Sequence, residues 1–580
     1  MRQTTPGAGR SRRGSPGQAV RLLLTLVVAI ALCGGSALAA TAQDGGGGKP
    51  PATRALKVMA AMQPGWNLGN SLDAIPDEES WGMPRTTREL LRNIKAQGFN
   101  SVRVPVTWSN FQSDTAPYTI DAAYLKRVKE VTDWAIAEGM YVEMPVHHDS
   151  WDWISAMPSD HDGVRARFDS TWRQIAATFR NTSQKLLFES VNEPQFKDAT
   201  DAQKTALLDE LNTSFHKIVR GSGGKNDSRV LVLPTLHASP SQALMDDLNA
   251  TIAKLDDPHL AATVHYYGHY PFSANIAGGI RFDEDSRRSM AEVFGLMRDN
   301  FIAKGIPVYL GEYGLLGFDS GEGAIERGEM LKYFEAIGHA ARTHGVTIAL
   351  WDNGAFYDRR AMKWRDQGVF DEIKSSWTTR SATADSDLVF LPETGAVPDR
   401  TLGLQLNGAR LEGLRTASGP VDGTEYAVSG DQLTLKSSLL TRLAGDRALG
   451  LNARLHADFS TGLPWEFRII TAGTPTASDA SGTTAGFTVP MAFRGDLLAT
   501  MEATYADGMA AGPPDWTTYK EYNRSFAPDH AGDTIALLPA FFEAVRDGEP
   551  VTLTFHFWTG TKVTYQVTRN GTTVTGRATG

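Results

Sequence analysis

The sequence is almost without cysteine, because only Cys33 occurs among its 580 residues. A single cysteine excludes an internal disulfide framework, and it also excludes the paired-cysteine sites that hold structural zinc. The folded chain must therefore be stabilised by the burial of apolar side chains. A chain of this length can form several hydrophobic cores, each large enough for a separate domain.

The sequence also lacks an apolar run that suits a membrane-spanning helix. Residues 22–33 are apolar, but a helical span of the bilayer needs about 20 such residues. Arginines precede this run and Ala37-Leu38-Ala39 follows it as an Ala-x-Ala cleavage site, which is the pattern of a secretory signal. We expect residues 1–42 to be removed and the protein to be secreted and extracellular. Cleavage after Ala42 and twin-arginine export through Arg12-Arg13 are alternatives within this interpretation.

Positive charge is in short supply. The chain has 57 basic and 66 acidic residues, which gives a net charge of −9. Removal of the signal takes away five arginines and no acidic residue, and leaves −14. We therefore expect neither nucleic acid nor an anionic membrane as a partner. The acidity is compatible with a soluble monomer that acts on a neutral polymer. Residues 43–54, rich in glycine and proline, are expected to be a flexible lead-in.

From about residue 55 to residue 380, strand-like runs alternate with amphipathic helical stretches, which is typical of parallel β-α units. Eight strands in this length predict an α/β fold, a (β/α)8 TIM barrel. A doubly wound open sheet is the alternative, although no strand is followed by the Gly-x-Gly-x-x-Gly motif of its dinucleotide-binding form. The expected strands lie near 65–69, 101–106, 141–146, 186–192, 230–235, 261–266, 307–311 and 347–351, and the helices include 121–138, 164–180, 203–219, 286–304 and 323–344.

Two of these strands end in a glutamate. Residues 186–196 form an apolar run that reaches Asn-Glu-Pro, with Glu193 before Pro194, and residues 306–314 repeat the design with Glu312. A helix cap is the alternative role for Glu193 taken alone. The ends of parallel barrel strands open on one face, and two carboxyl groups on one rim are what glycoside hydrolysis needs.

Other polar and aromatic residues gather at the same strand ends. Because adjacent histidines on a strand point to opposite faces, we do not expect His147 and His148 to bind one metal ion. No cofactor is expected either. The candidate substrate-contacting residues of the barrel are Asn67, Trp81, Arg103, His147, His148, Asn192, His265, Tyr267 and Trp351.

Cleavage of a glycosidic bond with retention of configuration sets requirements that these residues could meet. One carboxyl group must act as an acid and the other as a nucleophile, about 5–5.5 Å apart. The nucleophile must stay ionised, for which Arg103 is a suitable cation and Tyr267 a suitable hydrogen-bond donor. Asn192 is placed to hold the sugar 2-hydroxyl group.

Taken together, these segments resemble glycoside hydrolase family 5, on its bacterial endoglucanase and xyloglucanase side. The resemblance implies that Glu193 is the general acid/base, that Glu312 is the nucleophile and that Trp351 is a sugar platform. Trp81 would help to shape the cleft, and Met83 stands where the family usually has Asn. Of the two adjacent histidines, His147 is favoured to face the substrate; the other supporting residues are Arg103, Asn192, His265 and Tyr267. The matching motifs run in the family's order over about 60–375: Gly65-Trp66-Asn67-Leu68-Gly69-Asn70-Ser71-Leu72-Asp73, Arg103-Val104-Pro105-Val106, His147-His148-Asp149, Asn192-Glu193-Pro194, His265-Tyr266-Tyr267, Gly311-Glu312-Tyr313-Gly314 and Trp351.

The composition changes in the last 200 residues. Residues 381–387 are expected to be a short polar linker, and the catalytic domain to end near residue 380. Alternation of apolar and other residues then predicts two all-β modules, 385–472 and 474–580. We interpret the first as an immunoglobulin-like β-sandwich spacer and the second as a β-sandwich that binds carbohydrate.

The interpretation of the last module depends on its aromatic residues. Trp516, Tyr519 and Tyr522 cluster in a loop rich in glycine and proline, whereas Trp558 follows a strand pattern and is either a sugar contact or part of the core. The spacer resembles the X2 module, and the last module resembles carbohydrate-binding module family 46. This architecture implies that the last module can complete the catalytic cleft, with Trp516 in contact with decorated or insoluble glucan.

The sequence therefore predicts a secreted, retaining endo-β-1,4-glucanase that acts on cellulose, mixed-linkage β-glucan or xyloglucan. A β-mannanase on the same fold is the alternative among enzymes. A non-catalytic polysaccharide-binding protein is the alternative from another class, although the presence of both Glu193 and Glu312 argues against it.

Overall fold

The computed structural model describes residues 54–317 and 323–579. The expected signal, residues 1–42, and the lead-in up to residue 53 lie outside this range. Among the described helices, none combines the length and the apolar character that crossing a bilayer requires.

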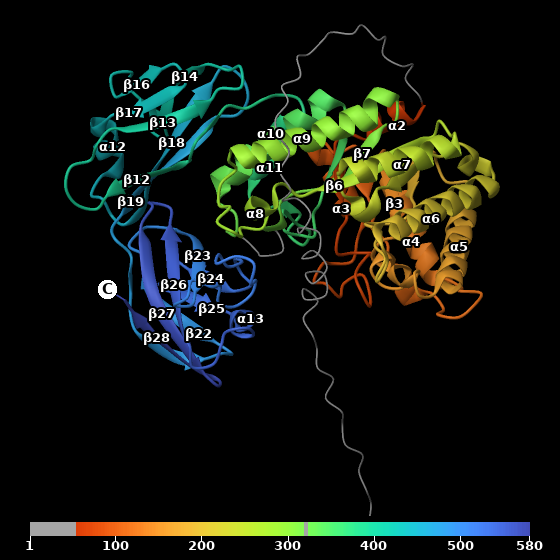
Figure 1. The fold of residues 1–580 in the computed structure, drawn as a ribbon. Helices are drawn as coiled ribbons and strands as arrows, with labels where there is room; N and C mark the ends of the chain where they lie inside the picture. The colour runs from red at the N-terminus through yellow and green to blue at the C-terminus, as the bar shows by residue number, and fades with distance from the viewer. Residues whose placement is uncertain (1–53, 318–322, 580) are drawn as a thin grey trace, which may run out of the picture. The chain divides into compact units, whose positions relative to one another are not determined.

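Within the described residues, eight parallel strands close into a barrel in chain order (Figure 1). The closure is direct, because Gly65 of the first strand pairs with Ser101 of the second and with Ala349 of the eighth. The expected TIM barrel is confirmed, and the open doubly wound sheet is wrong. The strands are β1 (Gly65–Asn67), β2 (Ser101–Arg103), β3 (Tyr141–Pro145), β4 (Leu186–Glu189), β5 (Leu231–Pro234), β6 (Leu260–Tyr266), β7 (Val308–Tyr313) and β8 (Thr347–Leu350).

Helices alternate with these strands, and most begin at a residue whose side chain accepts a hydrogen bond from the first turn. Thr87, Asp121 and Asp160 do so, and Thr200 forms a reciprocal capping box with Gln203. These caps satisfy backbone N–H groups that a helix start leaves without partners. The helices are α3 (Arg88–Gln97), α4 (Ala122–Ala137), α5 (His161–Thr178), α6 (Asp201–Gly221), α7 (Gln242–Leu255), α8 (Tyr270–Ser273), α9 (Glu284–Asn300), α10 (Arg327–His344) and α11 (Gln367–Ser376).

A further helix, α2 (Arg54–Met62), covers the end of the barrel where the strands begin. Its Met59 and Met62 belong to one buried cluster with residues from the strand starts, such as Leu187 and Val232. The Thr347 hydroxyl donates to the Met59 carbonyl at 2.8 Å. Because this end is filled with apolar side chains, the polar site lies at the opposite, carboxyl end of the strands.

The second module consists of two sheets and the short helix α12 (Ser437–Ala444). Its buried residues, such as Leu404 and Phe467, belong to the same hydrophobic cluster as those of the barrel. One sheet contains β11 (Thr383–Ala384), β13 (Arg400–Gln405), β17 (Gln432–Leu435) and β16 (Tyr426–Ser429); the other contains β12 (Leu388–Pro392), β19 (Trp465–Ala472), β18 (Gly450–Phe459), β14 (Leu411–Thr416) and β15 (Gly419–Pro420).

The expected polar linker at 381–387 is wrong. Ala382 and Ala384 are buried, and β11 within this segment pairs with β13. Asp387 is also buried, and its carboxylate pairs with Arg468 of the second module at 2.7 Å. Arg468 also pairs with Glu326, the residue that caps α10 of the barrel. The segment is therefore part of a packed seam.

The third module is again built from two sheets, with α13 (Pro539–Phe542) beside them. Alternating residues of its strands are buried, as in Val551, Leu553 and Phe555, which confirms the antiparallel β pattern. One sheet contains β20 (Thr476–Ala477), β22 (Phe487–Ala492), β25 (Thr534–Leu537) and β24 (Phe526–Asp529); the other contains β21 (Ala480–Thr483), β28 (Thr573–Ala578), β27 (Lys562–Asn570), β26 (Pro550–Phe557) and β23 (Leu498–Thr504).

A buried acid on α11 makes the stability of the barrel depend on pH. Burial raises the pKa of Glu372 to about 7, well above its value of about 4.5 in an unfolded chain. The protonated acid thus favours the folded state. This stabilisation is fully present below the pKa of Glu372 in the unfolded chain, and it is lost as the pH rises through the pKa of Glu372 in the folded protein. We expect Glu372→Gln to remove this loss, which is about 2 kcal/mol between pH 5 and pH 8.

Thermal melting at pH 5 and pH 8 measures the effect. The drop in melting temperature between the two pH values should be smaller in Glu372→Gln than in the unchanged protein. The exposed Glu292 provides the matched control, because Glu292→Gln should leave the drop as it is. An equal drop in both variants contradicts the assignment.

Candidate active site

Glu193 and Glu312 meet at the carboxyl end of the barrel although 119 positions separate them in the sequence. One carboxylate oxygen of each, together with a ring nitrogen of His265, forms a group in which all three atoms lie within 4.8 Å of one another. Glu193 lies in the turn after β4, where its φ of 37° is left-handed. A residue with a side chain adopts this conformation at a cost of about 1 kcal/mol.

A bulge in β7 places Glu312. The pairing of β6 with β7 shifts between Val264 and His265, so that His265 lies opposite Glu312, and Gly311 is the extra residue. A Cβ atom at Gly311 would lie 3.1 Å from Nε2 of His265 and 3.0 Å from Oγ1 of Thr263. The glycine is therefore needed for His265 and the bulge to pack against each other.

Glu312 is surrounded by groups that favour its ionised form. Nη1 of Arg103 donates to Oε1 of Glu312 at 2.6 Å, and the Tyr267 hydroxyl donates to Oε2. Burial raises the pKa of Glu312, but His265, Arg103 and the Tyr267 hydrogen bond together lower it below its ordinary value. An ionised carboxylate held by two donors is what a nucleophile requires.

Glu193 has different neighbours. Its side chain is 24% exposed, and its Oε1 lies 2.8 Å from Nδ1 of His265. His265 is itself buried, which lowers its pKa, but the charges of Glu312 and Glu193 raise the pKa above its ordinary value. The two glutamates thus share one histidine, but Arg103 and Tyr267 contact Glu312.

Two asparagines of the predicted set have different roles. Oδ1 of Asn192 accepts from Nη2 of Arg103 at 2.7 Å, and its buried Nδ2 has no partner among the described residues. That Nδ2 is a donor available to a bound sugar. Asn67 is fully buried; its Nδ2 donates to the Gly311 carbonyl at 2.9 Å and its Oδ1 accepts from Arg103 at 3.2 Å. Asn67 therefore supports Arg103, and its contact with substrate stays a prediction.

Four aromatic residues of the predicted set, together with Trp151, form a continuous row: Trp81, His148, His147 and Trp351. The ring of Trp81 lies 5.2 Å from that of His148, which lies 4.7 Å from Trp151 and 4.4 Å from His147. The His147 ring is in turn stacked on Trp351, with centroids 6.0 Å apart and planes inclined by 13°. Flat apolar faces of this kind suit the apolar faces of pyranose rings.

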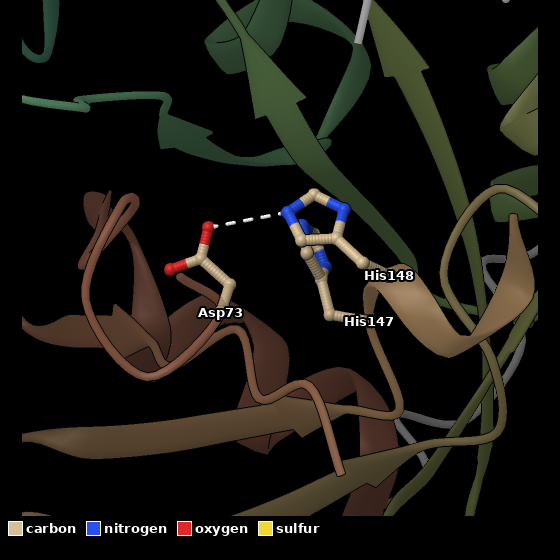
Figure 2. A group of neighbouring side chains, drawn as sticks. All are labelled: Asp73, His147 and His148. Atoms are coloured by element: carbon tan, nitrogen blue, oxygen red, sulfur yellow. Dashed lines mark ion pairs between the residues drawn. The ribbon is translucent and has the colours of Figure 1, made fainter. Parts of the chain in front are cut away.

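Figure 2 shows that the expectation of opposite-facing histidines is wrong. Strand β3 ends at Pro145, so His147 and His148 lie beyond the region in which side chains alternate. Nε2 of His148 lies 3.5 Å from Oδ2 of Asp73. Asp73, His147 and His148 are close enough to hold a metal ion, as are Glu193, His265 and Glu312. However, both Asp73 oxygens already accept from backbone N–H groups of its own turn, those of Asn70 and Ser71. We therefore assign the histidines to the aromatic row.

Two site residues were not foreseen from the sequence. Glu143 of β3 and Glu189 of β4 are fully buried, and both carboxylates contact Arg103, at 3.0 and 3.1 Å. The signal was present, because each is a charged residue inside an apolar strand, where ionisable side chains are rare unless paired. The partner could not be identified without the fold.

Comparison with known proteins agrees with this geometry. A family model described as cellulase (glycosyl hydrolase family 5) matches residues 63–357. Endoglucanase B of Paenibacillus lautus is 46% identical over 564 residues, which cover 96% of this chain and 99% of that protein. The chain belongs to glycosyl hydrolase family 5. The family 5 domain is followed by matches to the carbohydrate binding domain X2 at 384–469 and to the carbohydrate binding domain CBM46 at 473–577.

Solved structures resemble this chain over about nine-tenths of its length, the two further modules included. The full-length tri-modular endo-β-1,4-glucanase B of Bacillus halodurans has a TM-score of 0.88 at 46% identity, and the match covers 91% of this chain and 99% of that one. A tri-modular family 5 endo-β-1,4-glucanase of Bacillus licheniformis, solved with cellotetraose, has a TM-score of 0.77 at 29% identity over 91% of this chain and 99% of that one. The chain is thus a glycoside hydrolase of the cellulase type with two further modules.

The hydrogen bond from Tyr267 to Glu312 gives a prediction on pH dependence. In Tyr267→Phe the pKa of Glu312 loses one of the contributions that lower it and should rise. If Glu312 is the nucleophile, its ionisation sets the acidic limb of the kcat/KM profile. That limb should then move to higher pH, with a fall in kcat of about 10- to 100-fold.

The neighbouring Tyr266 is the matched control, because its hydroxyl faces Ser289 at 3.3 Å and not Glu312. Tyr266→Phe should leave the acidic limb in place. An unmoved limb in Tyr267→Phe means that the tyrosine does not tune the nucleophile.

Proposed function

We propose that the protein is a secreted, retaining endo-β-1,4-glucanase in which Glu312 is the nucleophile and Glu193 the general acid/base. The observation that carries the proposal is the separation of the two carboxylates, with an oxygen of each within 4.8 Å. Retaining enzymes have their two carboxyl groups about 5–5.5 Å apart, whereas inverting enzymes leave about 6.5–9.5 Å for a water molecule.

The difference between the two environments supports the division of roles. In the first step, Glu312 attacks the anomeric carbon while Glu193 gives its proton to the leaving sugar oxygen. Arg103 and Tyr267 keep Glu312 ionised until the covalent bond forms. In the second step, Glu193, now ionised, takes a proton from the water that releases the sugar from Glu312. The partly exposed position of Glu193 suits a group that exchanges protons with incoming water.

Secretion and the monomeric state belong to the same proposal. They rest on the signal pattern of residues 1–42, on the acidic charge and on a likeness to endoglucanases. The β-mannanase alternative is not favoured, because the relatives described above are named endoglucanases.

Replacing each carboxylate by an amide tests the roles proposed for Glu312 and Glu193. Glu312→Gln and Glu193→Gln should each lower kcat on β-glucan by about 10⁴-fold or more while the protein stays folded, because each removes a group that reacts. The matched control is Glu292→Gln on the exposed side of α9. Near-normal turnover by Glu312→Gln overturns the assignment.

Stereochemistry tests the mechanism independently. Azide should rescue Glu312→Ala and give a sugar azide of inverted configuration, whereas rescue of Glu193→Ala should give the retained configuration. The two products distinguish nucleophile from acid/base. A reducing-sugar assay over cellulose, mixed-linkage glucan, xyloglucan and mannan identifies the substrate, and faster hydrolysis of mannan would reject the glucanase.

We further propose that Trp516 of the third module contacts decorated or insoluble glucan. Trp516 is 50% exposed, in a loop whose backbone is held by Lys520. The buried Nζ of Lys520 donates to the carbonyls of Gly512 and Pro514, both at 2.9 Å. Trp558, by contrast, is half-buried, and the guanidinium carbon of Arg281 lies 4.8 Å from the centroid of its ring.

Trp516→Ala tests this role without removing the module. Activity on xyloglucan and insoluble glucan should fall about 5- to 100-fold, while activity on short soluble oligosaccharides stays within about twofold, because a single stacking contact contributes about 1–3 kcal/mol. Deletion of 474–580 should give the same pattern.

Met509→Ala is the control, since Met509 is a comparably exposed apolar residue of the same module. An equal loss on polymers and on oligosaccharides indicates a stabilising role only.

A further inference from the structure

One buried guanidinium, that of Arg103, contacts three carboxylates in the barrel interior. Arg103, whose side chain is fully buried, lies 3.0 Å from Glu143, 3.1 Å from Glu189 and 2.6 Å from Glu312. The partners come from three strands, β3, β4 and β7. Even with His265 on the other side of Glu312, the positive charges here are too few to neutralise three carboxylates, and an uncompensated charge in the interior is strongly unfavourable.

The hydrogen bonds that Arg103 donates reach only two of the three carboxylates. Nε of Arg103 donates to Glu189 at 3.1 Å and Nη1 donates to Glu312 at 2.6 Å. Nη2 donates to Asn192 at 2.7 Å and to Glu189 at 3.4 Å. Nε of Arg103 also lies 3.0 Å from Oε2 of Glu143, but its N–H is directed at Glu189; neither oxygen of Glu143, although both are buried, has a well-aligned donor among the described residues.

A proton on Glu143 resolves both problems. A carboxylic acid supplies the O–H donor that a carboxylate lacks. The acceptor is at hand, because Oε2 of Glu143 and Oε2 of Glu189 lie 3.0 and 3.1 Å from the same nitrogen, Nε of Arg103. Burial and the charge of Glu189 raise the pKa of Glu143 well above its ordinary value, against the opposing effect of Arg103. The titratable residue that β7 adds beside the pair, Tyr309, stays neutral, because burial raises its pKa as well.

We infer that Glu143 is a positioning residue that works as a neutral acid: it donates a hydrogen bond to Glu189, and the pair, with one negative charge in total, holds Arg103 against Glu312. The inference rests on the proposed function only in taking Glu312 as the nucleophile. A second negative charge below Arg103 would draw the guanidinium away from Glu312 and would disfavour the ionised nucleophile. The proton that Glu143 shares with Glu189 prevents this second negative charge.

Two substitutions at one position separate this role from simple packing. Glu143→Gln keeps a neutral side chain with an N–H donor, so kcat/KM should stay within about threefold and its acidic limb should not move. Glu143→Leu keeps the volume but removes the donor, so Arg103 is drawn toward Glu189. We expect kcat to fall at least about tenfold, with little change in KM, and the acidic limb to move about 0.5 pH units or more upward.

An ionised Glu143 would give a different experimental result. If Glu143 is ionised, Glu143→Gln deletes a negative charge near Glu312, and the acidic limb moves to lower pH by about 0.5 units or more. That result overturns the inference. Equal losses in Glu143→Gln and Glu143→Leu overturn it too, since the amide then fails to replace the acid.

Infrared difference spectroscopy gives a readout that does not require activity. At pH 6, full-length protein minus Glu143→Gln should show loss of the carbonyl band of one protonated carboxylic acid. Loss of a carboxylate band instead contradicts the inference. Glu372→Gln is the matched control, because it should lose a similar acid band at this pH and leave the kinetic pH profile unchanged. Failure of the glucanase proposal itself would appear as full activity of Glu312→Gln, and the infrared result would be unaffected.

Discussion

The site depends on Arg103, the last residue of β2, and on the burial of its charge. A buried guanidinium is tolerated only when carboxylates and amides satisfy its donors, and here Glu143, Glu189, Glu312 and Asn192 surround it from three other strands. The same contacts connect the interior of the barrel and determine which carboxylate carries charge. Structure and reactivity are therefore set by one network, and its members cannot be exchanged independently.

Glu193 and Glu312 differ in their surroundings because the backbone places them in different ways. Glu312 is turned toward Arg103 by a bulge at Gly311 within a strand, whereas Glu193 lies in a left-handed turn after its strand has ended. One therefore lies deep among cations and donors, and the other lies near the surface beside His265. In the mechanism that we propose, these surroundings give the two glutamates the separate roles that a retaining glycosidase requires.

The sequence was sufficient to predict the barrel, because apolar runs and amphipathic helices alternate regularly and Glu193 and Glu312 each lie at or just after a strand end. It failed where the answer depends on partners distant in sequence. Residues 381–387 look like a polar linker, yet Asp387 is buried in an ion pair with Arg468, 81 positions away. The rule of alternating side chains was applied to His147 and His148 beyond the end of their strand. The partner of Glu143 and Glu189 could be recognised only from the fold, which places Arg103 between them.

The loop that carries Trp516 shows how the third module can present a side chain without contributing to the chemistry. Burial lowers the pKa of Lys520 to about 8, and such desolvation is unfavourable unless the ammonium group gains hydrogen bonds. It gains them from backbone carbonyls on both sides of Trp516, those of Gly512, Pro514 and Thr517. Because the loop is fixed before any ligand arrives, little conformational entropy is lost when a sugar stacks on the exposed indole. In the function that we propose, the module therefore changes which polymers are held, whereas Glu193 and Glu312 both lie on the barrel.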